Sequence, residues 1–259
     1  MLLGVNIDHI AVLREARKIN DPDPLDALGI VKRSGADQIT IHLREDRRHI
    51  HDEDARKIIE SASLPINLEC AISEEMIEKA LMFRPHRVTL VPEKREEVTT
   101  EGGLDVVKNF NTIALIAKKF EKAHIELSLF IDPTLEMIHA SSKLHAQWIE
   151  LHTGLYANLY AMLYSNISKT HHSISSLELE RDVLHVKLQE ALAELSKSAE
   201  YAHTLGLKVA AGHGLNYHNV KAIKTIPQII EFNIGQSIIA RSVFVGLEVA
   251  IKEMVELLK

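Results

Sequence analysis

Short apolar segments recur along the chain, and an amphipathic stretch follows almost every one of them. Runs of aliphatic and β-branched residues bounded by polar ones are typical of buried strands, whereas apolar positions three and four apart indicate helices. The pattern predicts strands at residues 2–7, 38–43, 65–71, 87–92, 125–131, 148–154, 208–214 and 229–235.

The alternation of strands with helices favours a parallel sheet, because no two strands are joined by a tight hairpin turn. Eight such units are the number that closes a (β/α)8 TIM barrel, and 259 residues suit one barrel domain, residues 1–259. A doubly wound open sheet is the alternative, but the first strand lacks the glycine fingerprint of that fold. The predicted class is therefore α/β, a (β/α)8 barrel with extra helices.

Capping residues locate several helices. Asp23 before Pro24 predicts an N-cap for a helix that ends at Gly35. Ser73 and Thr134 are predicted N-caps of later helices. A basic linker at 14–18, helices at 51–63, 104–122 and 177–195, and a long final helix to residue 259 complete the prediction.

The segment between the sixth and seventh strands is longer than the other connections. We expect a helical insertion at about 155–198, with a polar, serine-rich part at 165–176. The helix after it carries one apolar stripe, which packs either on the barrel or on a neighbouring subunit. The stripe consists of Leu184, Leu188, Leu192 and Leu195.

Composition limits the functional classes. The formal net charge is −6, so no overall basic field for nucleic acid exists. Cys70 is the one cysteine, which excludes an intramolecular disulfide and suits a reducing compartment. The first residues do not resemble a signal peptide, and no apolar run is long enough to cross a membrane. We therefore expect a soluble cytoplasmic protein without a membrane or nucleic-acid partner.

A cationic cluster follows the second strand, at residues 41–50. Arginine and histidine side chains at this density favour a phosphate ligand. The alternative is a solvated loop whose charges neutralise each other. We expect the phosphate role for His42, Arg44 and His49, and the solvated role for residues 45–48.

Polar residues end nearly every predicted strand, where working residues of such barrels lie. Histidines and glutamates that converge there suit proton transfer, since each can be tuned toward neutral pH. Buried acids are costly unless they are paired or protonated. The set is Asn6, Asp8, His9, His42, Arg44, Glu69, Glu93, Asp132, Glu150, His152, His213, Asn233 and Gly235.

Glycines after the last two strands predict a phosphate cradle. Gly212-His213-Gly214 follows the seventh strand and residues 233–237 follow the eighth, the usual phosphate position of this fold. Arg17, Arg44 and His49 are candidates for a second anion. A metal site built from Asp8, His9, Glu69, His152 and His213 is considered, but no His-x-His or His-x-x-x-His pair ends a strand, so no metal is expected.

Four segments together resemble the pyridoxine 5′-phosphate synthase family, at residues 4–11, 42–50, 91–103 and 211–215. The resemblance implies a barrel with extra helices that assembles as a homo-octamer. It implies condensation of 1-deoxy-D-xylulose 5-phosphate with 3-amino-2-oxopropyl phosphate in vitamin B6 synthesis, with release of phosphate and water. Neither a metal nor an organic cofactor is implied.

The resemblance also assigns roles to residues. It implies His42 and Glu69 as proton acceptors, His213 as proton donor and Glu150 as a further acid or base. The sugar phosphate would contact Asp8, His9, Arg44, His49 and Thr99. The aminoketone phosphate would contact Asn6, Arg17, Gly214, Gly235 and Gln236.

Two features depart from that family. Gln236 stands where the family has histidine, which matters only if the side chain, rather than a helix N–H, holds the phosphate. The segment 155–198 exceeds the usual sixth unit. A metal-dependent barrel hydrolase or aldolase and a non-catalytic phosphate sensor remain the competing interpretations.

Overall fold

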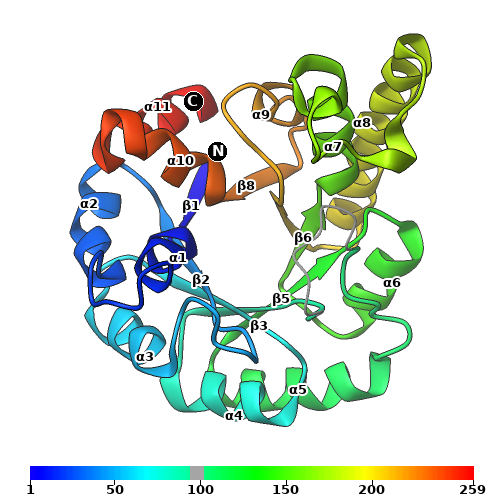
Figure 1. The fold of residues 1–259 in the computed structure, drawn as a ribbon. Helices are drawn as coiled ribbons and strands as arrows, with labels where there is room; N and C mark the ends of the chain where they lie inside the picture. The colour runs from blue at the N-terminus through cyan, green and yellow to red at the C-terminus, as the bar shows by residue number, and fades with distance from the viewer. Residues whose placement is uncertain (94–101) are drawn as a thin grey trace.

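The computed structural model describes residues 1–93 and 102–259. Its centre is a closed barrel of parallel strands in chain order, surrounded by helices (Figure 1). The predicted (β/α)8 barrel is therefore confirmed. The strands are β1 (Leu2–Asn6), β2 (Gln38–His42), β3 (Ile66–Cys70), β4 (Arg87–Leu90), β5 (Glu126–Ile131), β6 (Trp148–His152), β7 (Lys208–Gly212) and β8 (Ile229–Ile234).

The first strand closes the barrel. Gly4 of β1 lies opposite Gln38 of β2 on one side and opposite Asn233 of β8 on the other. In the next pair, His42 of β2 lies opposite Glu69 of β3. Because all strands run in the same direction, the residues that follow them meet at one end of the barrel.

Helices cover the outside of the barrel, including short ones between the main elements. α10 and α11 pack on each other, and α11 contacts β1 (Figure 1). The helices are α1 (Asp8–Glu15), η1 (Pro24–Asp26), α2 (Ala27–Arg33), α3 (Asp52–Ser61), α4 (Glu74–Phe83), α5 (Phe110–Ala123), α6 (Leu135–Lys143), α7 (Gly154–Tyr164), η2 (Ile167–Lys169), η3 (Ser175–Leu177), α8 (Arg181–Thr204), α9 (Val220–Ile223), α10 (Gln236–Val245) and α11 (Leu247–Leu258).

Two of the three predicted caps are confirmed. Asp23 accepts the N–H of Leu25, and Thr134 accepts the N–H of Met137. Ser73 precedes α4 as predicted, but its hydroxyl makes no capping hydrogen bond there. Its Oγ is buried without a hydrogen-bond partner among the residues that the structure describes.

Two predicted segments differ from the structure, one near the N-terminus and one between β4 and β5. Arg14 of the expected basic linker lies in helix α1, where it is buried and pairs with Asp54 at 2.7 Å, whereas Arg17 and Lys18 lie in the turn that follows the helix. The helix predicted from 104 begins only at Phe110. The N–H of Leu104 instead bonds to the carbonyl of Phe130 at 2.7 Å, which holds this segment against β5.

The C-terminal half shows two further differences. The expected long final helix is two helices, because Gly246 adopts φ +82°, a conformation that glycine tolerates and a helix does not. The helix predicted at 177–195 is α8, which begins at Arg181 and continues to Thr204. Leu177 belongs to η3, where its side chain is buried.

The leucine stripe of α8 packs within the chain. Leu184, Leu188 and Leu195 are buried, and Leu192 packs on the same core. α8 contacts both α7 and α6, and Figure 1 shows α7 and α8 side by side at the rim of the barrel. The leucine stripe therefore packs on the helices and barrel of its own chain, which is one of the two partners considered for it.

The barrel interior is polar, while the strands' outer faces are apolar. Arg87 of β4 and Glu231 of β8 form an ion pair at 2.7 Å, although these strands are not neighbours in the sheet. The pair must therefore cross the interior. The guanidinium of Arg87 also lies 3.7 Å from the ring centroid of Trp148. Within the described part of the chain, no helix has the length and apolar character needed to span a membrane.

Candidate active site

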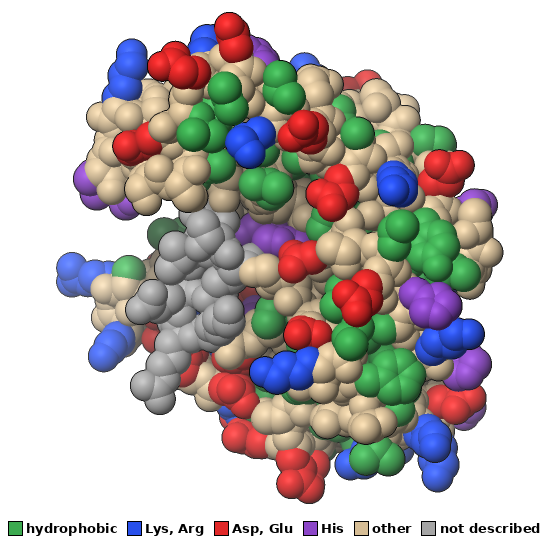
Figure 2. Space-filling model, turned by 90° about the vertical axis from the view of Figure 1, so that its right-hand side faces the viewer, with side chains coloured by type: hydrophobic (Ala, Val, Ile, Leu, Met, Phe, Trp, Pro, Cys, Tyr) green, Lys and Arg blue, Asp and Glu red, His purple; other side chains and the backbone are tan. Residues whose placement is uncertain are grey.

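The carboxyl ends of the strands form a hollow, and Figure 2 shows histidine side chains at its inner wall. Asn6 and Asp8 lie at its edge, at the end of β1, and are hydrogen-bonded to each other. Nδ2 of Asn6 donates to Oδ2 of Asp8 at 2.8 Å, and the N–H of Asp8 donates to Oδ1 of Asn6 at 2.9 Å. The other oxygen of Asp8 accepts the N–H of His42 at 2.9 Å. The end of β1 thus fixes the end of β2.

His42 is buried at this junction as a neutral base. Its Nδ1 lies 4.0 Å from Oε2 of Glu69, and its Nε2 is buried without a hydrogen-bond partner in the described residues. Burial and the nearby charges of Arg44 and His49 lower the pKa of His42 to about 3. The imidazole is therefore uncharged at neutral pH and can accept a proton.

Arg44 and His49 lie beside His42. The Arg44 side chain is buried, with Nε 3.8 Å from Oε1 of Glu93. Nδ1 of His49 accepts the N–H of Ile50 at 2.8 Å, so the proton of neutral His49 resides on Nε2. Nε2–H and a guanidinium are both donors that suit phosphate oxygens.

The residues between them behave as the solvated-loop interpretation expects. Arg48 pairs with Asp46 at 2.7 Å, and Arg47 pairs with Asp52 at 3.3 Å and with Glu75. These charges neutralise each other on the surface, so they leave Arg44 as the buried cation of the cluster.

Two glutamates share the interior of the mouth. Burial raises the pKa of Glu69 well above its usual value, and the nearby carboxylates of Glu150 and Asp8 raise it further. Burial likewise raises the pKa of Glu150 to about 7, against the opposing hydrogen bond from Asn233. The raised pKa favours the protonated form of Glu69, while Glu150 is balanced between its two forms near neutral pH.

The loops after β7 and β8 present backbone groups to the same hollow. His213 and Gly214 adopt positive φ values of +79° and +76°. The hydroxyl of Thr153 donates to the carbonyls of Gly212 and His213 at 2.7 and 2.6 Å, which fixes this turn. Gln236 is the first residue of α10, directly after Gly235. This helix N-terminus is the arrangement that binds anions through N–H groups.

The second loop is tied to the first strand. An added Cβ at Gly235 would lie 2.8 Å from Cβ of Asn6, so only glycine fits. Ser237 Oγ donates to the carbonyl of Leu215 at 2.8 Å and joins the two loops. His9, on α1, is half-buried next to Asp8.

One predicted binding residue is not brought into this arrangement, and a second cannot be placed. Arg17 is exposed in the turn after α1, and its guanidinium makes no ion pair with any described residue. Thr99 lies outside the described residues.

The sequence placed Asn233 at a strand end but gave it no role. In the structure its Nδ2 donates to Oε2 of Glu150 at 2.7 Å. The sequence signal that could have predicted this contact was the position of Asn233, which faces inward two residues before Gly235.

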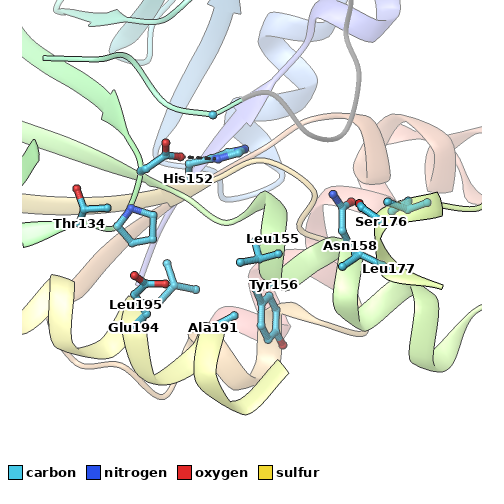
Figure 3. Close-up of a pocket in the computed structure, with 14 residues that line it drawn as sticks. Thr134, His152, Leu155, Tyr156, Asn158, Ser176, Leu177, Ala191, Glu194 and Leu195 are labelled. Atoms are coloured by element: carbon cyan, nitrogen blue, oxygen red, sulfur yellow. Dashed lines mark hydrogen bonds and ion pairs between the residues drawn. The ribbon is translucent and has the colours of Figure 1, made fainter. Parts of the chain in front are cut away.

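A cavity of about 390 Å³ adjoins the mouth on the side of α7 and α8 (Figure 3). His152 lies at its upper wall, and Leu155, Tyr156 and Leu195 form much of the rest. Across residues 1–93 and 102–259, no group of three or more histidine, cysteine or acidic side chains is arranged to hold a metal ion.

The family model for the pyridoxal phosphate biosynthesis protein PdxJ matches residues 3–259. This chain belongs to the PdxJ family. The family and the enzyme class that the sequence motifs indicated are therefore confirmed.

Members of the family with curated names are similar from end to end. The chain is 66% identical over 258 residues to the pyridoxine 5′-phosphate synthase of Sulfurovum sp. (strain NBC37-1), which covers 100% of each chain. It is 62% identical over 259 residues to that of Aliarcobacter butzleri (strain RM4018), covering 100% of this chain and 99% of the relative. Because both match over their whole length, the segment 155–198 has a counterpart in each of them.

Solved structures of lower identity share the fold. A phosphoribosylanthranilate isomerase from Thermotoga maritima aligns with a TM-score of 0.57 at 14% identity, covering 100% of this chain and 98% of that one. A mutant tryptophan synthase α-subunit from Pyrococcus furiosus aligns with a TM-score of 0.56 at 10% identity, covering 100% and 96%. At this identity the likeness concerns the barrel alone.

Proposed function

We propose that this chain condenses 1-deoxy-D-xylulose 5-phosphate with 3-amino-2-oxopropyl phosphate to form pyridoxine 5′-phosphate, with release of phosphate and water. The names of the close family members support this activity. The observation that carries the proposal is the contact between His42 and Glu69, 4.0 Å apart inside a buried mouth. His42 is a neutral base, and burial favours the protonated form of Glu69, so together they can move a proton without a metal or cofactor.

Two phosphate groups need two anion sites. Arg44 and His49, with Asp8, His9 and Thr99, are proposed to hold the sugar phosphate. The N–H groups of Gly214, Gly235 and Gln236, with Asn6, are proposed to hold the aminoketone phosphate, helped by the positive end of α10. Arg17 is proposed to reach the second phosphate, although it lies exposed after α1.

The reaction begins with a Schiff base between the substrate amine and the sugar ketone. Water leaves from the carbinolamine, and loss of a carbon-bound proton to His42 gives an enamine. The hydroxyl next to the enamine then leaves as a second water, phosphate departs, one water adds, and an aldol-type closure with loss of a third water yields the aromatic ring, so that each turnover releases one phosphate and, on balance, two waters. Each proton that leaves carbon or reaches a departing oxygen needs an acid or a base at that point.

Different side chains of the site are proposed to carry out these proton transfers. His42 can take a proton because its lowered pKa leaves the imidazole unprotonated at neutral pH. Burial favours the protonated form of Glu69, and the residue becomes a proton acceptor after the cationic Schiff base forms, since a nearby cation favours the carboxylate. Glu150, with a pKa of about 7, can give or take a proton at neutral pH. His213, at the rim, donates to the leaving oxygen.

Assembly and location complete the proposal. We propose a cytoplasmic homo-octamer. Val243 and Phe244 at the end of α10 are 68% and 84% exposed, and such an apolar surface is typical of a subunit contact. Light scattering of the purified chain measures the assembly, and a monomer at micromolar concentration would contradict it.

Incubation of the purified chain with both phosphorylated substrates tests the activity. We expect fluorescent pyridoxine phosphate and one equivalent of inorganic phosphate for each turnover, also after dialysis against a chelator. Tight binding of both phosphates without product would indicate a sensor instead. Activity that disappears with the chelator and returns with zinc or iron would indicate a metal-dependent enzyme.

A further inference from the structure

Asp132 and His152 occupy two strand ends of the same mouth, yet none of the roles above uses them. Nδ1 of His152 lies 3.1 Å from Oδ1 of Asp132, and the two side chains follow β5 and end β6 (Figure 3). The ring of His152 meets the ring of His213 edge to face, with centroids 4.8 Å apart and an angle of 65° between the planes. Three consecutive strands therefore place a carboxylate and two imidazoles in one row.

The carboxylate fixes the tautomer of His152. The hydrogen bond with His152 lowers the pKa of Asp132 below its usual value, so Asp132 is ionised at neutral pH. Its Oδ1 also accepts the N–H of Gly103 at 2.9 Å, which holds the carboxylate in place. An ionised carboxylate can only accept, so neutral His152 carries its proton on Nδ1.

The row is closely packed. His152 is only 9% exposed, and its Nε2 has no hydrogen-bond partner in the part of the chain described. A Cβ added at Gly154 would lie 2.5 Å from this Nε2 and 3.2 Å from Cδ2 of His213, so the two rings meet where glycine leaves room. Phe130 contacts both rings, with centroids 5.1 and 6.4 Å away.

His213 itself stands on an exposed turn between two glycines. A proton donor needs a fixed ring and a charged form. The wall formed by His152 and Phe130 restricts the ring, and the edge-to-face contact is a favourable aromatic geometry. A nearby anion raises the fraction of a histidine that is protonated at a given pH.

We propose that Asp132 and His152 form a positioning pair for His213, which holds its ring in place and keeps it protonated for proton donation. This inference rests on the proposed function for the role of His213. His152 is a positioning residue here, because it acts through His213.

Other ionisable groups also face this row. Glu150 lies two residues before His152 on the same face of β6, and its Oε1 lies against Gly212 next to His213. Tyr156 of α7 stays neutral, because burial raises its pKa to about 12. Glu194 of α8 lines the far side of the adjoining cavity. Among these acids, Asp132 is the one bonded to an imidazole that touches His213.

The first test measures the pKa of His213 directly, without turnover. Full-length protein labelled with 13C at histidine Cε1 is titrated by NMR, and the spectrum of H213Q assigns the resonance. Asp132→Asn keeps the size of the side chain and removes its charge, and we expect it to lower the pKa of His213 by about one pH unit. Glu194→Gln is the matched control that removes a charge at the same cavity, and we expect no shift. An unchanged His213 pKa in folded Asp132→Asn would overturn the inference.

The second test uses turnover of both phosphorylated substrates. His152→Phe keeps a ring but removes the hydrogen bond, whereas His152→Asn keeps a donor for Asp132 and removes the ring. We expect each to lower kcat roughly 10- to 100-fold with little change in KM, and the acidic group in the pH profile to move down in Asp132→Asn. Wild-type turnover in both His152 variants would refute the inference even if Asp132→Asn fails to fold. Absence of product from the wild-type chain would instead refute the proposed function, and the NMR result would still stand.

Discussion

Asn233 donates a hydrogen bond of 2.7 Å from Nδ2 to Oε2 of Glu150 inside the barrel. The carbonyl oxygen of the same amide accepts from Gln38 and Thr40, at 3.3 and 3.2 Å. These two donors fix the orientation of the amide, so its NH2 group must face Glu150. One neutral donor offsets only part of the cost of burying a carboxylate. Glu150 therefore retains a raised pKa of about 7.

The raised pKa predicts how stability depends on pH. The folded chain binds the proton of Glu150 more tightly than the unfolded chain does, for which the reference pKa is 4.5. This stabilising contribution is complete below pH 4.5 and is lost as the pH rises through about 7. We expect Glu150→Gln to match the wild type at pH 4 and to exceed its free energy of unfolding at pH 8 by up to about 3 kcal/mol.

Urea unfolding at the two pH values measures this difference. Glu194→Gln, an exposed glutamate on α8, is the control and should show the wild-type pH dependence. An identical pH dependence in Glu150→Gln and the wild type would show that Glu150 is ionised in the folded chain at pH 5.

Replacement of His42 tests its role as a base. His42→Asn removes the buried imidazole, and we expect turnover to fall by roughly 10²–10⁴, the usual contribution of a general acid or base. Binding of inorganic phosphate should persist, because Arg44 and His49 remain. His124→Asn is the control, since His124 is exposed and adopts φ +57°, which asparagine tolerates. Near-normal turnover in His42→Asn would eliminate the role.

Glu69→Gln separates chemistry from binding. The amide keeps the size of the neutral acid but can neither release nor accept the proton, so we expect kcat to fall by roughly 10²–10⁴ with KM little changed. Steady-state kinetics with each substrate varied in turn provide both parameters. A rise in KM at unchanged kcat would make Glu69 a binding group instead.

Gly212→Ala tests the position of Glu150. The added Cβ would lie 2.0 Å from Oε1 of Glu150, so the carboxylate must move away from Asn233. A displacement of this size costs about 10²-fold in turnover when it moves an acid or base. Gly29→Ala is the control, because its Cβ would meet only Arg33 Nη1 at an ordinary 3.5 Å. Equal activity of both variants would show that Glu150 is free to move without loss.

Gln236→His tests the departure from the family pattern. Gln236 is exposed in the first turn of α10, where backbone N–H groups are available to the phosphate. We therefore expect KM for the aminoketone phosphate to change within about twofold, the size of an ordinary surface effect. A large fall in KM would show that the side chain, and not the backbone, contacts this phosphate.

The sequence predicted the barrel and most strand ends because those signals are local. Apolar runs specify strands, and a polar residue such as His42 or Glu69 marks where each ends. The break at Gly246 was missed because a single glycine inside an apolar helical pattern does not show whether the helix stops there. The inward turn of Arg14 was missed because its partner, Asp54, lies on a different helix.

Pairings across the barrel were likewise beyond the sequence. Asn233 meets Glu150, and Asp132 meets His152, through the order of strands around the barrel rather than through spacing along the chain. The pKa values of Glu69 and Glu150 depend on burial and on each other, which only the closed barrel determines.

Arg87, Glu150, Glu231 and Asn233 form a column of hydrogen-bonded polar side chains inside the barrel. This column also restricts which substitutions the protein can accept during evolution. Arg87 bonds to Glu231, Asn233 contacts Glu231, and Asn233 bonds to Glu150. Replacing a member by a side chain that lacks the matching donor or acceptor leaves a neighbour with an unsatisfied polar group in a space that water does not readily supply. We therefore expect such single substitutions to be selected against, and lineages to exchange members of the column together or to keep all of them.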